Sequence, residues 1–387
     1  MPKVSVILSN YNGEQYLKES ISSVLKQTYV DFEFIIVDDA STDSSRKVID
    51  SYNDSQIKRY YAEKNRHIAY SLNKALEMAS GEYIARIDSD DIWETNKLEL
   101  QVRYMDEHRE CGACFTKVNI IDKYSVIAND IYEEYYHMFN DAENKSQIEW
   151  LRFFFYKGNC LCHPSVVIRK SVLENVGKYH LAYVPAEDYE LWSRIVMHYP
   201  IFVMEEKLVR YRWEESDNKI SGNTNGRIYA FPNIIMLARK RILNLLDDEI
   251  FVECFKEEFV NKYSSTPEEL ECEKAHILLR CSGNNMNFLG LEKYEQILER
   301  NEMLFVLEEK MGFSLPEYYK EYRTKNFALP GEIDRVNTEI EYLRSTLENK
   351  QREIEHLQFL VNEMGSSTSW KVTSSLRKAM RILKRRK

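Results

Sequence analysis

The chain has 387 residues, which is long enough for two or more domains with substantial cores. Its formal net charge of -9 gives no general attraction for nucleic acid. No apolar run approaches the roughly 18 residues of a membrane span, and the run at residues 4–8 is too short for a signal peptide. Seven cysteines, an odd number, fit a reducing compartment, so we expect a cytoplasmic protein.

The first hundred residues alternate between short apolar runs and apolar stripes at helical spacing. The runs are typical of buried parallel strands and are expected at residues 4–8, 32–37, 57–61 and 83–87. The helical stripes between them cover residues 17–25, 48–52 and 68–79. Repeated strand–helix–strand units predict an α/β fold with a mostly parallel, doubly wound sheet.

Polar residues follow each predicted strand, at the edge where such sheets bind ligands. They are residues 9–12, 38–43, Asn65 and 88–91, and two of these segments are rich in carboxylates. Two acidic clusters that meet at one edge of a sheet need a counter-ion or a ligand rich in hydrogen-bond donors. The sequence therefore predicts a ligand site at this edge.

Asp88 and Asp90 form the most specific signal, because the pair lies directly after a strand. Mg²⁺ or Mn²⁺ prefers such oxygen ligands and would bridge the phosphates of a nucleotide diphosphate. The alternative is that these carboxylates cap a helix and face solvent. Cys111 and Cys114 loosely match the spacing of zinc ligands, but they lie in an apolar run typical of a core.

Two further carboxylates are candidates for binding and catalysis. Asp39 follows the second strand and could accept a hydrogen bond from uracil, while Tyr11 could stack on the base or contact the ribose. Asp188 lies at the start of an apolar helical stripe and could accept a proton from an acceptor hydroxyl. From composition alone, ordinary helix capping by Asp188 is the favoured explanation.

Short motifs in the first part of the chain occur in a characteristic order. They are residues 4–7, 10–12, 20–21, 27–28, 37–43, 73–75, 81–84, 87–91, 158–159, 162–165 and 187–192. Together they resemble glycosyltransferase family 2, over about residues 3–221. The resemblance implies a GT-A fold and inversion of configuration at the anomeric carbon.

The resemblance also implies roles for individual residues. Asp39 would bind the base, with Ser9 and Tyr11 beside it. Asp88 would contact the ribose or the metal ion, Asp90 would hold the metal ion, and Asp188 would be the catalytic base. This implication outweighs the capping explanation for Asp188.

Two positions depart from the family pattern. His67 stands where many members have glycine, two residues after an asparagine equivalent to Asn65. Glu214 and Glu215 follow the segment where many relatives carry a histidine that caps the diphosphate. The second departure puts the lid over the donor in doubt.

By composition, the chain divides into a transferase domain and three further parts. We expect a transferase domain at residues 1–221, a helical region at 222–330, a coiled coil at 331–364 and a basic amphipathic tail at 365–387. The heptads place Ile333, Ile340, Leu347, Ile354 and Val361 at one core position and Val336, Leu343, Lys350, Leu357 and Met364 at the other. This pattern predicts a homodimer, and the tail suits an anionic membrane surface.

These observations predict an inverting, metal-dependent glycosyltransferase with Mg²⁺ or Mn²⁺ as cofactor. The donor would be a nucleotide-diphosphate sugar, most simply a UDP-sugar, and the acceptor a glycan or lipid-linked hydroxyl at the cytoplasmic face of a membrane. One alternative is a sugar-phosphate nucleotidyltransferase, but residues 10–13 do not form its glycine-rich loop. Another is an inactive transferase domain on a coiled-coil scaffold, which the intact aspartates disfavour.

Overall fold

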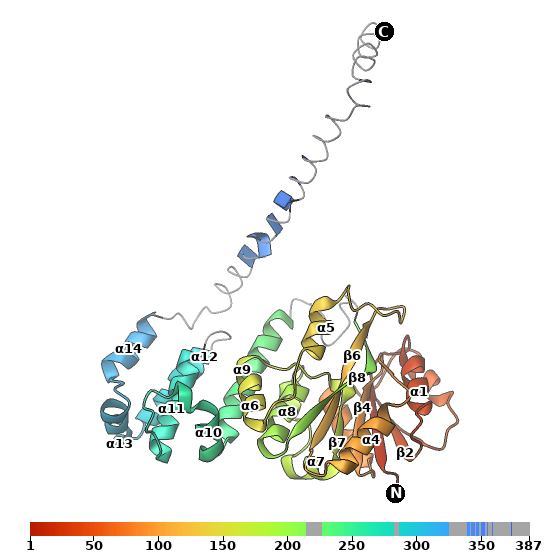
Figure 1. Ribbon diagram of the computed structural model, residues 1–387, viewed down its shortest axis with the longest axis horizontal. Helices are drawn as coiled ribbons and strands as arrows, with labels where there is room; N and C mark the ends of the chain where they lie inside the picture. The colour runs from red at the N-terminus through yellow and green to blue at the C-terminus, as the bar shows by residue number, and fades with distance from the viewer. Residues whose placement is uncertain are drawn as a thin grey trace. The chain divides into compact units, whose positions relative to one another are not determined.

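The structure is a computed structural model that describes residues 1–213, 227–281 and 286–324, with scattered helical positions between 339 and 373. The chain forms two compact units, Met1–Ser314 and Leu315–Lys387. The first unit contains an eight-stranded sheet and the helices around it (Figure 1).

The four predicted strands form one half of this sheet, in the order β3-β2-β1-β4 and with parallel pairing. They are β1 (Val4–Asn10), β2 (Phe32–Asp38), β3 (Ile57–Tyr61) and β4 (Tyr83–Asp88). All four begin where the sequence predicted, and β1, β2 and β4 extend one or two residues further. These extensions bring Ser9 and Asp88 into the sheet.

The other half of the sheet contains β7, β6, β8 and β5, in that order. Their bounds are β5 (Ile92–Trp93), β6 (Ala113–Ile121), β7 (Val167–Arg169) and β8 (Ile201–Arg212). β7 pairs antiparallel with β4 and β6, and β5 pairs antiparallel with β8, whereas β6 and β8 are parallel. The sheet is therefore mixed, and the predicted parallel order holds only for its first half.

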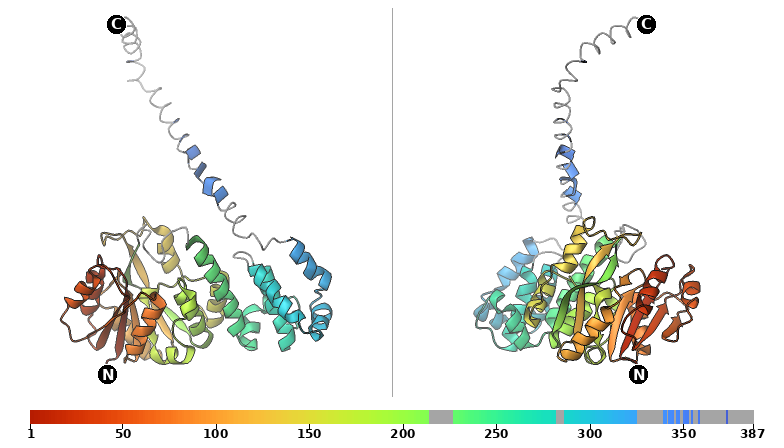
Figure 2. Two further views of the ribbon diagram at one scale, coloured as in Figure 1. Left: turned by 180° about the vertical axis from the view of Figure 1, so that it is seen from behind. Right: turned by 45° about the vertical axis from the view of Figure 1, so that its right-hand side comes forward.

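Helices cover both faces of the sheet, as a doubly wound arrangement requires (Figure 1 and Figure 2). Ile7 packs with α3 (Ile68–Met78), α6 (Gln147–Tyr156) and α8 (Glu187–His198). Its neighbours Val6 and Leu8 belong to the cluster of α1 (Leu17–Leu25) and α4 (Lys97–Glu107). Successive residues of a strand point to opposite faces, so β1 contributes to both clusters. The remaining helices of this region are α2 (Ser45–Asp50), α5 (Glu133–Asn140) and α7 (Lys170–Val176).

The segment after β8 is helical, as predicted. It contains α9 (Arg227–Leu245), α10 (Asp248–Phe255), α11 (Pro267–Arg280), α12 (Met286–Leu298), α13 (Glu302–Phe305) and, in the second unit, α14 (Leu315–Thr324). α10 ends at Phe255. Beyond it, the N–H groups of Val260 and Asn261 bind the buried carboxylate of Glu273 at 2.8 and 2.9 Å, which favours a loop over a continued helix.

Several sequence predictions concern residues outside the described part of the chain. These are Glu214 and Glu215, most of the predicted coiled coil at 331–364 and nearly all of the basic tail at 365–387. The described positions within 331–364 are helical, and Ile340, Leu343, Leu347 and Ile354 are exposed. The domain boundaries at 221 and 330 also stay predictions. Among the described residues, no helix is both long and apolar enough to cross a bilayer.

Candidate active site

The carboxyl end of β1 lies between two other strand ends that carry candidate residues. Ser9 is in register with Val37 of β2 on one side and with Asp88 of β4 on the other. The N–H of Asp39 donates to the carbonyl of Asn10 at 2.8 Å. Ser9, Asp39 and Asp88 therefore meet at one edge of the sheet, and half-exposed Tyr11 follows directly after β1.

The two neighbouring aspartates after β2 have different surroundings. Asp38 is fully buried and accepts hydrogen bonds from Asn10 at 3.0 Å, from the N–H of Ser41 at 3.1 Å and from Arg46 at 2.7 Å. These bonds join the end of β2 to the end of β1, to the loop after β2 and to α2, which is a structural role. Asp39 is also buried, but among the described residues its carboxylate accepts only from the N–H of Arg66, at 3.0 and 3.1 Å from its two oxygens. A carboxylate with a single donor retains lone pairs for a ligand.

His67, which departs from the family pattern, adopts a backbone conformation that normally requires glycine. Its φ of 67° and ψ of 169° lie in a region that side chains rarely occupy. The chain turns here from the Asp39–Arg66 hydrogen bonds into α3, which begins at Ile68. His67 therefore takes a conformation that suits glycine, with an exposed imidazole.

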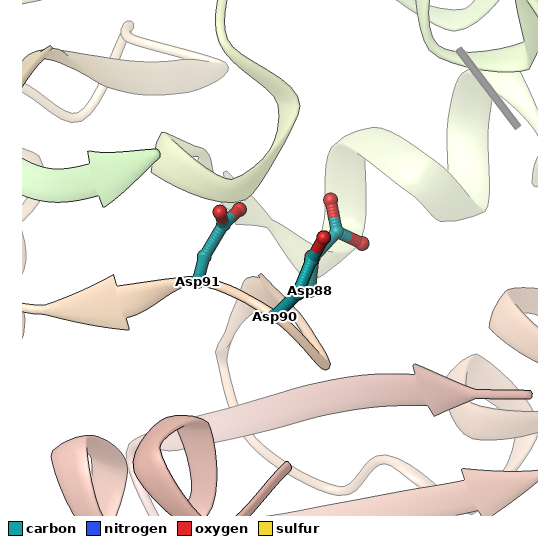
Figure 3. A group of neighbouring side chains, drawn as sticks. All are labelled: Asp88, Asp90 and Asp91. Atoms are coloured by element: carbon teal, nitrogen blue, oxygen red, sulfur yellow. The ribbon is translucent and has the colours of Figure 1, made fainter. Parts of the chain in front are cut away.

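Asp88 is the last residue of β4, and Asp90 and Asp91 lie on the short turn between β4 and β5 (Figure 3). One carboxylate oxygen from each lies within 4.8 Å of the others. Three oxygen ligands on one turn fit a hard divalent cation such as Mg²⁺ or Mn²⁺. The sequence predicted Asp88 and Asp90 as metal ligands but not Asp91, which is fully buried.

Arg212 supports this acidic turn from the end of β8. It is buried, its N–H donates to Asp91 Oδ1 at 2.7 Å, and its Nε donates to the carbonyl of Asp90 at 2.7 Å. Its Nη2 donates to Glu19 of α1 at 2.9 Å. One arginine therefore connects the acidic turn to β8 and α1. This role of Arg212 was not predicted from the sequence.

Glu187 and Asp188 begin α8, and the charges of Arg86 and Asp88 act on Glu187. Asp188 is partly buried, and its carboxylate accepts from Asn159 Nδ2 at 2.9 Å and from the N–H of Tyr189 at 2.7 Å. Burial raises the pKa of Asp188 above its usual range, against the hydrogen bond from Tyr189 and the charge of Arg86. Burial, followed by the charge of Asp188, also raises the pKa of Glu187.

Arg86 connects the acidic turn to this carboxylate pair. It lies on β4, is buried, and forms an ion pair with Asp88. Its positive charge lowers the pKa values of both Glu187 and Asp188, so it lies close enough to affect them electrostatically. The sequence did not single out Arg86, because one arginine in an apolar strand resembles an exposed position.

The motif at residues 162–165 is buried and has a supporting role. His163 Nε2 lies 2.8 Å from the Tyr179 hydroxyl, and the carbonyl of Pro164 accepts a hydrogen bond from Trp93 Nε1 at 3.0 Å. Burial lowers the pKa of His163 well below its usual value, so the imidazole is neutral at physiological pH. These contacts tie the motif to β5 and to the segment before α8.

Comparison with known proteins adds to this geometry. Residues 5–177 match the model of a family described as glycosyl transferase family 2. An uncharacterized glycosyltransferase of Methanocaldococcus jannaschii is 32% identical over 235 residues, which are 59% of this chain and 77% of that protein. The chain belongs to glycosyltransferase family 2. This membership supports a transferase over a nucleotidyltransferase.

Two further comparisons bear on function and on fold. The Escherichia coli protein named UDP-Glc:alpha-D-GlcNAc-diphosphoundecaprenol beta-1,3-glucosyltransferase WfgD is 32% identical over 221 residues, which are 57% of this chain and 80% of that protein. The crystal structure of S. aureus TarS 1-349 in complex with UDP-GlcNAc aligns with a TM-score of 0.53 at 20% identity. This alignment covers 83% of this chain and 90% of that chain, and it confirms a GT-A-like α/β fold.

Proposed function

We propose that this glycosyltransferase moves a sugar from a UDP-sugar to a hydroxyl of a glycan or lipid-linked acceptor, with inversion, during the synthesis of a surface polysaccharide. The main support is the meeting of two carboxylate groups beside one sheet edge. Asp88, Asp90 and Asp91 form the first group, and Glu187 and Asp188 the second, with Arg86 electrostatically coupled to both. The relative from E. coli, whose name describes transfer from UDP-Glc to a lipid-linked acceptor, adds further support.

In the proposed reaction, Asp188 accepts the proton of the acceptor hydroxyl as its oxygen attacks the anomeric carbon. The bond from that carbon to the diphosphate oxygen breaks on the opposite side, so a single displacement inverts the configuration. Ionised Asp188 is the form that acts as a base, and the N–H groups of Asn159 and Tyr189 stabilise this form. General-base catalysis of this kind contributes roughly 10²–10⁴-fold.

Asp88 and Asp90 would hold Mg²⁺ or Mn²⁺, and buried Asp91 completes the set of oxygen ligands. Such an ion neutralises the negative charge that grows on the leaving diphosphate. Asp39 and Tyr11 would bind the base of the donor, and Ser9 lies beside them in register with Asp88. Asp39 accepts hydrogen bonds in this role, which suits the N3–H of uracil.

The donor and the metal ion can be tested together by thermal melting. UDP with Mn²⁺ should raise the melting temperature, since a ligand that binds only the folded state stabilises it. GDP with Mn²⁺ should have little effect. Asp90→Asn should remove the contribution of Mn²⁺ and abolish transfer while keeping the fold. Protection by GDP and none by UDP would contradict the proposed donor.

We also propose that residues 331–364 form a homodimeric coiled coil and that the basic tail at 365–387 binds the cytoplasmic face of a membrane. The heptad pattern and the clustered Lys and Arg residues support these roles. Truncation after Pro330 should give a monomer that no longer binds anionic vesicles and is still active on a soluble acceptor. A truncated protein that remained dimeric and bound vesicles would exclude both roles.

A further inference from the structure

The side chain of Asn159 forms a hydrogen bond with the proposed catalytic base. Its Nδ2 donates to Asp188 Oδ2 at 2.9 Å, although the two residues are 29 positions apart in the sequence. The N–H of Leu161 donates to Asn159 Oδ1 at 3.0 Å. Because the amide oxygen is occupied by this donor, the amide NH₂ group must face Asp188.

Hydrogen bonds fix the backbone on both sides of this contact. Gly158 has a φ of +94° and ends α6, with its N–H directed at the carbonyls of Phe153 and Phe154 at 3.3 Å. The hydroxyl of Tyr189, in the first turn of α8, donates to the carbonyl of Phe154 at 2.5 Å. Asn159 and Asp188 thus extend from two helix ends that are bonded to each other.

The proposed base consequently has an N–H donor at each of its oxygens. The N–H of Tyr189 binds Oδ1 at 2.7 Å, and it is fixed because it belongs to the helix backbone. Asn159 binds Oδ2 and sets the rotation of the carboxylate. Each oxygen keeps a lone pair that can accept the proton of the acceptor hydroxyl.

We propose that Asn159 is a positioning residue that orients the carboxylate of Asp188 for proton transfer from the acceptor. This inference rests on the proposed role of Asp188 as the base. The hydrogen bond also favours the ionised carboxylate and lowers the pKa of Asp188, against the effect of burial. Other charged or titratable groups near Asp188 are Glu187 on α8, Arg86 on β4, Cys162 and Tyr179.

The test compares Asn159→Leu, which removes the donor, with Asn159→Asp, which has the same shape but replaces the donor with a carboxylate. Release of UDP from UDP-glucose and UDP-GlcNAc is measured with Mn²⁺ and with water as the acceptor. We expect kcat to fall roughly 10- to 100-fold, as for other small misplacements of a reacting group. The donor KM should change less than about twofold, because Asn159 is not among the residues proposed to bind the donor.

The pH profile separates positioning from a general loss of structure. The acidic limb of kcat should move to higher pH in Asn159→Leu and further in Asn159→Asp. The control is Asn144→Leu, because the Asn144 amide also makes two hydrogen bonds, at 2.9 and 2.7 Å, but to the backbone of Val203. It should lower the melting temperature without moving the acidic limb.

A double-mutant cycle provides a readout that needs no substrate. Asn159→Leu should lower the melting temperature more at pH 8 than at pH 5, because the lost donor matters most to the ionised carboxylate. In an Asp188→Asn background this pH dependence should disappear. Loss of kcat with an unmoved acidic limb, or a pH-independent change in melting temperature, would overturn the positioning role. Activity retained by Asp188→Asn would instead overturn the proposed function, and with it this inference.

Discussion

Buried carboxylates near the amino ends of the parallel strands have different partners from those near the carboxyl ends. Near the amino ends, Glu33 accepts from the hydroxyl of Ser5 at 2.6 Å and from the hydroxyl and N–H of Ser80 at 2.8 and 2.7 Å. It also forms an ion pair with Lys58. Despite burial, these partners lower the pKa of Glu33 to about 2.

Beside the carboxyl ends, Glu187 and Asp188 have fewer partners. A buried oxygen of Glu187 finds no hydrogen-bond partner among the described residues, and burial raises the pKa values of both carboxyls. Such under-stabilised groups cost folding energy and are typical of functional sites. The comparison shows that buried charge alone does not mark a site. A carboxylate whose partners do not compensate for its burial is the informative one.

The largest expected effect is that of Asp188→Asn at the carboxyl edge. We predict a loss of about 10²–10⁴-fold in kcat, because the base is removed. The raised pKa of Asp188 means that the ionised form is disfavoured in the folded state. Stability linked to this group is present at low pH and is lost as the pH rises through its folded-state pKa.

Asp188→Asn should therefore be more stable than the wild type at pH 8, and this gain should shrink at pH 5. Melting curves at the two pH values and UDP release at pH 8 measure both effects. A variant that was destabilised equally at both pH values would show that Asp188 supports the fold. The division into a stabilising amino edge and a functional carboxyl edge would then be wrong.

The second prediction concerns Glu33→Gln at the amino edge. The substitution keeps the shape of the side chain but removes the charge that binds Lys58 and the two serines. The free energy of unfolding should therefore fall by about 2–3 kcal/mol at pH 7. The pKa of Glu33 is lowered to about 2, so its contribution is present above pH 4.5 and is lost as the pH falls toward 2. Denaturant unfolding at pH 7 and pH 3 should show a smaller difference at pH 3.

Activity distinguishes this variant from Asp188→Asn. Glu33 lies at the opposite end of β2 from Asp39, so kcat should change less than about twofold once the protein is folded. A large loss of kcat in folded Glu33→Gln would contradict the division into a stabilising edge and a functional edge.

The sequence predicted the first half of the sheet well because its strands are continuous apolar runs. It also predicted that Ser9, Asp39 and Asp88 meet, because parallel strand ends share one edge. None of the four strands of the second half was predicted, and β7 and β5, with three and two residues, carry no periodicity. Their antiparallel pairing depends on contacts between segments far apart in the chain.

Within the site, the residues that were missed are those whose roles depend on tertiary contacts. Arg86 and Arg212 look like polar interruptions of strands, and only the fold shows that each contacts the acidic turn. Asp91 lies in the predicted acidic run, so its neighbours provided a signal for it. The motif containing Asn159 was noticed, but its hydrogen bond to Asp188 crosses 29 positions and could not be inferred from spacing.

The smallest expected effect is that of Ser80→Ala, which removes one of the hydrogen bonds to Glu33. The hydroxyl at 2.8 Å is lost, while the N–H of Ser80, at 2.7 Å, still donates to the same carboxylate oxygen. Ser5 and Lys58 are also unchanged, so the charge stays compensated. The free energy of unfolding should fall by about 1 kcal/mol at pH 7, as for a typical hydrogen bond. This difference should shrink as Glu33 is protonated. Denaturant unfolding against a matched Ser51→Ala control, whose hydroxyl binds only a carbonyl in α2, measures this. If Ser80→Ala cost as much as Glu33→Gln, the stability of the amino edge would depend on one bond and not on the whole set of partners.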